Sequence, residues 1–138
     1  MKYRIAKRCD LDHIVDLHLK VREVYDIGFF SKMGRSFLKK YYQINIDDPN
    51  EIILCAESDN GTICGFCSGS LDVAKQTANF KRHKILLAFS AIPSIICHPY
   101  LIQELWRRFR FSLGQTDEQY IITEGARSEY WTWDKTIN

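Results

Sequence analysis

The feature that most constrains the fold is a hairpin in the middle of the chain. Residues 51–57 and 62–71 are two runs rich in apolar and β-branched residues, and Ser58-Asp59-Asn60-Gly61 separates them. An Asn-Gly pair between two such runs is typical of a tight antiparallel turn. We therefore expect two adjacent antiparallel strands here, and the remaining elements have to pack around them.

The sequence before the hairpin predicts one strand and two helices. Residues 3–8 alternate in polarity and indicate a strand, after which Asp10 suits a helix N-cap. Residues 11–25 carry apolar side chains at helical spacing, and residues 34–46 do so again. The order β-α-α-β-β follows from these signals.

The sequence after the hairpin is mainly helical. An apolar helix is expected over residues 80–92, and Pro93 should kink or end it. His98-Pro99 forces a further break before a second amphipathic helix that extends to residue 113. The tail, residues 114–138, is polar except for Tyr120-Ile121-Ile122 and an aromatic cluster around Trp131. That cluster either covers a sheet edge or belongs to a disordered end.

Composition indicates one globular domain. The chain has 138 residues, of which 46% are hydrophobic and 26% charged. It has no secretory signal and an odd count of five cysteines, which favours reduced thiols and a cytoplasmic location. No apolar run reaches the roughly 18 residues of a membrane span.

The sequence contains one C-x-x-C pair, Cys64 and Cys67, within the second strand of the hairpin. Residues three apart on a strand point to opposite faces of the sheet, so these thiols should neither pair nor share a metal ion. The four histidines supply no further ligand pattern. We expect no metal site.

Positive charge is concentrated in residues 75–110, where Glu104 is the only acid and seven basic residues occur: Lys75, Lys81, Arg82, Lys84, Arg107, Arg108 and Arg110. Such a segment can lie on an anionic membrane surface or contact phosphates. The interpretation that we favour is a solvated helix face, which is the usual role of a charge run. No nucleic-acid-binding signature accompanies it.

The order and the residues that fill it resemble the N-terminal half of a GNAT-type N-acetyltransferase. Four segments carry this resemblance: 3–18, 29–42, 53–69 and 81–111. The first two are similar to the family's first strand and two helices, and the third to its second and third strands. The last is similar to a helical insertion, here 75–113, that one subgroup carries after the third strand.

The resemblance implies an α+β fold with an incomplete mixed sheet over residues 1–113. It also implies acetyl-CoA as co-substrate and a small amine, such as an amino sugar, as acceptor. Phe29, Phe30 and Met33, in the loop that often flanks the acceptor, are the expected substrate-binding residues. No catalytic or cofactor-binding residue is identified.

The sequence lacks the family's Q/R-x-x-G-x-G/A loop for acetyl-CoA, and no fourth strand is expected. The resemblance therefore predicts a chain that is truncated, inactive alone, or completed by another chain at an unpaired sheet edge. The alternative function is a non-catalytic interaction module, which would use the basic helices of residues 81–110 on a membrane surface or an acidic partner.

Overall fold

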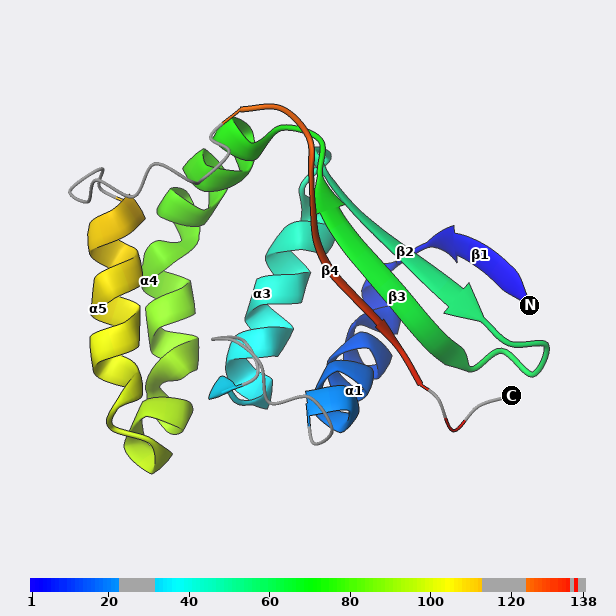
Figure 1. The fold of residues 1–138 in the computed structure, drawn as a ribbon, viewed down its shortest axis with the longest axis horizontal. Helices are drawn as coiled ribbons and strands as arrows, with labels where there is room; N and C mark the ends of the chain where they lie inside the picture. Colours follow the sequence, from blue (N-terminus) through cyan, green and yellow to red (C-terminus); the bar gives the residue numbers. More distant parts are fainter. Residues whose placement is uncertain (23–31, 113–123, 135, 137–138) are drawn as a thin grey trace.

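The structure is a computed structural model that describes residues 1–22, 32–112, 124–134 and 136. Its elements follow the order β1 (Lys2–Ile5), η1 (Arg8–Asp10), α1 (Leu11–Arg22), α3 (Arg35–Asp47), β2 (Glu51–Glu57), β3 (Ile63–Ser70), α4 (Val73–Cys97), α5 (Leu101–Ser112) and β4 (Arg127–Trp133) (Figure 1). The fold is α+β, as the sequence predicts.

The four strands form one antiparallel sheet in the order β1-β2-β3-β4. The predicted hairpin is confirmed, with Glu51 opposite Ser70 at its open end. Gly61 closes the turn with a φ of 84°, a conformation that glycine adopts without steric cost. All three strand pairs in the described residues are antiparallel, and the expectation of a mixed sheet is wrong.

The expectation that this chain lacks a fourth strand is also wrong. Strand β4 pairs with β3 along most of its length, from Gly65 opposite Trp133 to Ser70 opposite Arg127. The edge of β3 that was expected to be unpaired is thus occupied by the aromatic part of the tail, and β1 and β4 are the outer strands instead. Covering that edge is the first of the two roles considered for the cluster around Trp131.

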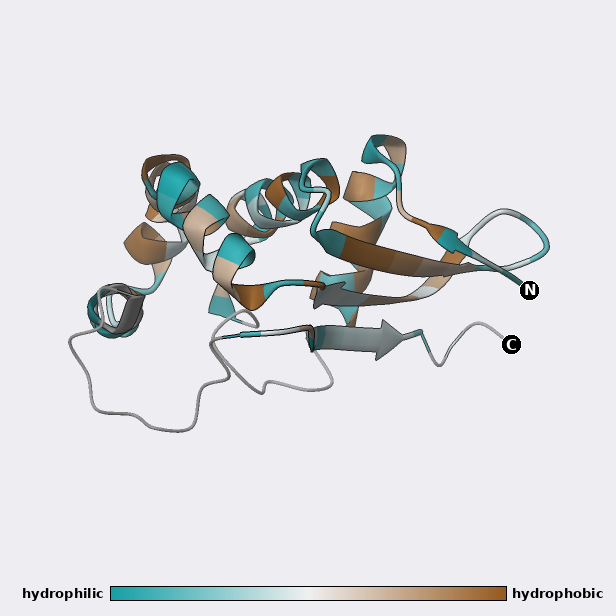
Figure 2. Ribbon diagram, turned by 90° about the horizontal axis from the view of Figure 1, so that it is seen from above, coloured by the Kyte–Doolittle hydropathy of each residue, from teal (hydrophilic) through white to brown (hydrophobic). Residues whose placement is uncertain are grey.

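Helices α1 and α3 cover one face of the sheet (Figure 2). The core between them includes Ile14 and Val15 from α1, Leu38 and Tyr42 from α3, and Phe66 from β3, all nearly inaccessible to solvent. A second, smaller core joins the helices α3, α4 and α5, and its buried members are Met33, Phe37, Ala91 and Leu101.

The helices differ from the sequence expectations at two places. Asp72 caps α4 by accepting hydrogen bonds from the backbone N–H groups of Ala74 and Lys75, so α4 begins earlier than predicted. The helix also continues through Pro93 to Cys97. Buried Ala91 and Ser94, on either side of the proline, pack against the rest of the protein and keep the helix continuous.

The remaining helix boundaries agree with the sequence where the structure describes them. Helix α1 is described as far as Arg22, and residues 23–25 lie outside the described part of the chain. Helix α3 spans Arg35–Asp47, within one residue of the prediction. The break at His98-Pro99 separates α4 from α5. None of the described helices combines the length and hydrophobicity needed to cross a bilayer.

Candidate functional site

A network of polar side chains lies between the sheet and the helices α3 and α4. We call it the polar network, and its members come from four elements: Tyr41 from α3, Glu51 from β2, Gln76 from α4, and Arg127 and Glu129 from β4. Gln76 is 2% exposed, which is unusual for glutamine. The other four members are partly buried, and the gathering of these polar groups around one buried side chain makes the network the strongest candidate for a functional site in the described residues.

Hydrogen bonds connect the network from end to end. Gln76 Nε2 donates to Glu51 Oε2 at 2.8 Å, and Gln76 Oε1 accepts from Arg127 at 3.1 Å. The Arg127 guanidinium also donates to Glu129 Oε1 at 2.8 Å, while the Tyr41 hydroxyl donates to Glu129 Oε2 at 2.9 Å. Two carboxyl groups are therefore held in one chain of hydrogen bonds, and a single arginine lies between them.

Glu51 is the carboxyl of the network whose pKa is raised to near neutrality. Burial raises the pKa of its carboxyl to about 7, although hydrogen bonds from Ser70 and Gln76 oppose the shift. Its Oε1 atom is buried and has no hydrogen-bond partner among the described residues. A carboxyl that titrates near neutral pH and has an unused oxygen is suited to accept and return a proton.

Tyr41 also holds its proton more tightly than usual. Burial and the neighbouring charge of Glu129 raise the pKa of its hydroxyl well above the usual value. The hydroxyl therefore stays protonated and acts as a hydrogen-bond donor to Glu129. Glu129 is fixed in this way from two sides, by Tyr41 and by Arg127.

A β-bulge lies at the same place in the sheet. Ser68 is opposite Tyr130 and the next residue, Gly69, is opposite Ser128, so Glu129 is the additional residue of β4. A bulged residue leaves the regular ladder and changes the direction in which its side chain points. This explains how Glu129 enters the polar network on the side of α3.

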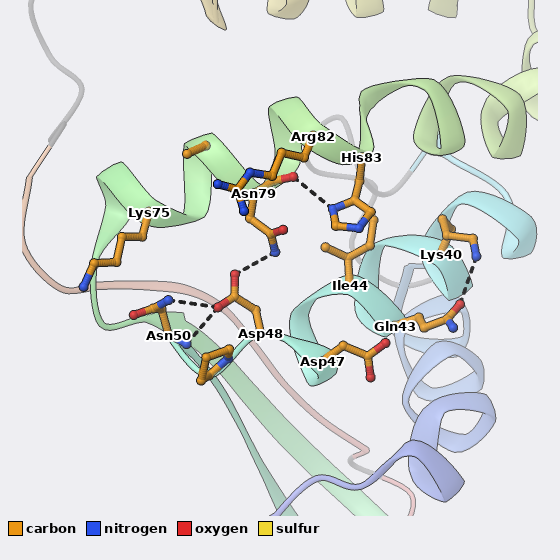
Figure 3. A pocket seen from close by; sticks show the side chains of 12 residues that line it. Lys40, Gln43, Ile44, Asp47, Asp48, Asn50, Lys75, Asn79, Arg82 and His83 are labelled. Atoms are coloured by element: carbon orange, nitrogen blue, oxygen red, sulfur yellow. Dashed lines mark hydrogen bonds between the residues drawn. The ribbon is translucent and has the colours of Figure 1, made fainter.

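A cavity of about 650 Å³ lies between the second half of α3 and the first half of α4 (Figure 3). Among its lining residues are the basic side chains Lys40, Lys75, Arg82 and His83. Lys75, Arg82 and His83 come from α4, whereas Lys40 belongs to α3, as does Asp47.

Both carboxylates of the cavity already have partners. Asn79 donates to Asp48 at 2.6 Å, and the side chain of Asn50 does so at 3.0 Å. Asp47 is paired with Arg8 at 2.6 Å. Asn50 lines the cavity and directly precedes Glu51, a member of the polar network, so the two features lie next to each other in the sequence.

Of the three predicted substrate-binding residues, the structure describes Met33 alone. Phe29 and Phe30 lie outside the described part of the chain. Met33 is 0% exposed and packs in the core of α3, α4 and α5 with Phe37 and Leu101. Their role in binding a substrate stays a prediction.

The two thiols of the C-x-x-C pair lie in different environments. Cys64 is buried at a bulge, because Gly65 is opposite Ala56 and Ile63 is opposite Glu57, whereas Cys67 is partly exposed opposite Leu54 and Trp131. Both are free thiols. No group of histidine, cysteine and acidic side chains in the described residues has the arrangement of a metal site.

Comparison with protein-family models, with curated proteins and with solved structures found no match to this chain. A functional interpretation must therefore rest on the order of the elements and on the chemistry of the polar network. The network supplies a carboxyl with a pKa near neutrality, a fixed second carboxylate and a partly buried phenol. These groups are suited to proton transfer.

Replacing Glu51 with glutamine should stabilise the protein at pH 8 but not at pH 4. Because the pKa of Glu51 is higher in the folded than in the unfolded chain, its stabilising contribution is complete below about pH 4.5 and is lost as the pH rises through about 7. Glu51→Gln removes this loss. With allowance for partial solvent exposure, we expect a gain of about 1–2 kcal/mol at pH 8.

Urea unfolding of the wild type and of Glu51→Gln at both pH values measures this difference. Glu124→Gln is the control, because it removes a carboxyl that is exposed and lies outside the polar network. If Glu51→Gln gives the same change at both pH values, then Glu51 does not titrate as the structure indicates.

Proposed function

We propose that this chain forms the acceptor side of a GNAT-type N-acyltransferase, which transfers an acyl group from a thioester to a small primary amine. The observation that carries the proposal is β4. It follows the helical segment α4–α5 and pairs antiparallel with β3, as expected for a fourth strand in the fold that the sequence resembles.

The polar network gives the proposal its chemistry. The neutral amine attacks the thioester carbonyl, a new N–C bond forms, the C–S bond breaks and the sulfur leaves as a thiolate, which takes up the proton that the amine has lost. The amine must lose a proton in the process, and Glu51 Oε1 is the acceptor that we assign to it. Glu129 and Arg127 hold the position of the site by their mutual ion pair.

The proposal concerns the acceptor side only. The family binds the pyrophosphate of acetyl-CoA with a Q/R-x-x-G-x-G/A loop, and this sequence does not contain that motif. We therefore assign no residue of this chain to the nucleotide part of the donor. The test below uses a donor that has no nucleotide.

The experiment combines glucosamine with S-acetyl-N-acetylcysteamine, a small thioester, and follows thiol release and amine acetylation. We expect acetylation of glucosamine above the rate without protein. Glu51→Gln should lower the protein-dependent rate by about 10²-fold, the lower end of what a general base contributes. Glu124→Gln should leave the rate unchanged, because Glu124 is exposed and lies outside the polar network.

Binding is measured separately by calorimetry, with N-acetylglucosamine as the matched ligand that has no free amine. Glucosamine should give a saturable signal and its N-acetyl derivative a weaker one. Equal binding of the two sugars, or thiol release that Glu51→Gln does not alter, would overturn the proposal.

A further inference from the structure

Helix α4 carries a row of large apolar side chains that faces solvent. We call this row the α4 stripe, and it consists of Ile85, Phe89, Ile92 and Ile96, which are 63%, 67%, 43% and 73% exposed. Their spacing of four, three and four residues places them on one face of the helix. Ala91 and Ser94, which pack toward the core, lie on the opposite side. Contiguous exposed apolar side chains of this kind mark an interaction surface.

The stripe continues into a basic region at the N-terminal end of α4. Lys81 lies one helical turn before Ile85 on the same face, and Arg82 lies beside it. Both side chains are exposed. The whole of α4, Val73–Cys97, contains no acidic residue.

Helix α5 brings a second group of basic residues to the same end. It runs antiparallel to α4 and lies beside it (Figure 1), so its last turns are next to the first half of α4. Arg107 and Arg110 belong to those turns. Two basic segments that are well separated in the sequence thus meet at one end of the α4–α5 pair, while the apolar stripe extends toward the other end.

We propose that the α4–α5 pair docks on the surface of an anionic lipid bilayer. The α4 stripe enters the boundary between headgroups and acyl chains, and Lys81 and Arg82 contact the anionic headgroups. Nothing in this docking requires a helix to span the bilayer, in agreement with the lengths and hydrophobicity of the described helices. The inference is independent of the acyltransferase proposal, because no member of the polar network belongs to the stripe.

Charge complementarity favours a lipid surface over a second copy of the chain. If two copies paired stripe to stripe in parallel, the basic ends would face each other. If they paired antiparallel, Lys81 and Arg82 of one copy would lie over the apolar end of the other. Neither arrangement provides an anion, since Glu104 is the only acid in residues 75–110. A bilayer with anionic lipids offers both an apolar layer and a negative surface.

Co-sedimentation with vesicles tests this proposal. The vesicles contain phosphatidylcholine alone or an equal mixture of phosphatidylcholine and phosphatidylglycerol. Binding to the anionic vesicles should be at least tenfold stronger than to the neutral ones at about 0.1 M salt. It should fall at least tenfold at about 1 M salt, where the Debye length shortens from about 10 Å to about 3 Å.

Two pairs of variants separate the apolar and the electrostatic contributions. Phe89→Ser with Ile96→Ser removes the apolar contact, and the control is Tyr3→Ser with Ile5→Ser, at side chains of similar exposure on the open sheet face. Lys81→Glu with Arg82→Glu removes the headgroup contact, and the control is Lys2→Glu with Lys7→Glu, which changes the net charge equally. Each test pair should weaken vesicle binding at least tenfold, and neither control pair should do so.

Three results would overturn the proposal. The first is no binding to the anionic vesicles, and the second is an equal loss in the control pairs, which would indicate only general charge attraction. The third is a stripe-dependent dimer in sedimentation velocity without vesicle binding, because the occupant of the stripe would then be a second copy. Circular dichroism confirms that each variant is folded.

Discussion

Replacing Arg127 with methionine is expected to lower the free energy of unfolding by about 2–3 kcal/mol. The guanidinium of Arg127 donates to Gln76 and to Glu129, and the side chain of Glu129 is only 12% exposed. Removal of one partner from a buried ion pair leaves the other charge uncompensated, which costs about 3–5 kcal/mol when both groups are fully buried. We expect less here because the Arg127 side chain is 35% exposed.

The double variant Arg127→Met with Glu129→Gln distinguishes this cause from general damage to the sheet. The double variant also removes the Glu129 charge that Arg127→Met leaves unpaired. Urea unfolding should therefore show the double variant to be more stable than Arg127→Met alone. Arg8→Met is the matched control, because Arg8 is 72% exposed in its pair with Asp47 and should cost less than about 1 kcal/mol. If the effects of Arg127→Met and of Glu129→Gln on the free energy of unfolding add up to the effect of the double variant, then Arg127 and Glu129 are not coupled.

The elements that were predicted correctly have strong local signals. Residues 51–71 combine two β-rich runs with Asn60-Gly61, and these signals alone specify the turn, the pairing and the alternation of faces. The opposite orientation expected of Cys64 and Cys67 rests on that alternation, which the bulge at Cys64 interrupts. Helix α3 also has a strong local signal, because its apolar residues recur with a helical period.

Strand β4 could not be predicted in the same way. It pairs with β3, but α4 and α5 separate these two strands in the sequence, so no turn motif indicates that they are neighbours. Tyr130 and Trp131 point to opposite faces and are both aromatic, and the bulge at Glu129 interrupts the period of two. The sequence alone therefore showed only a polar tail with an aromatic cluster, and not a strand.

The polar network was missed for a related reason. Glu51 and Glu129 belong to strands that are distant in the sequence, and each alone has the character of an ordinary surface carboxylate. Only the fold brings them together around Gln76 and Arg127. The continuation of α4 through Pro93 is likewise a tertiary effect, since contacts of Ala91 and Ser94 compensate for the missing backbone hydrogen bond.

Replacing Gly69 with valine is expected to detach β4 at its bulge and to destabilise the protein by about 3 kcal/mol. A Cβ atom at position 69 would lie 2.8 Å from the backbone oxygen of Arg127 and 3.4 Å from the Cα atom of Ser128. Both are backbone atoms, which cannot turn aside as a flexible side chain would. The strand must therefore move, and the polar network loses Arg127 and Glu129 with it.

Hydrogen exchange reports this movement directly. In Gly69→Val the amides of β4 should exchange faster, while those of the β1–β2 pair keep their protection. Cys67→Val is the matched control, because it places the same side chain on the same face of β3, two residues before Gly69. Because Cys67 is partly exposed, we expect Cys67→Val to lower the free energy of unfolding by less than about 1.5 kcal/mol. Equal exchange of the β4 amides in both variants would mean that close contact at Gly69 does not hold β4 in place.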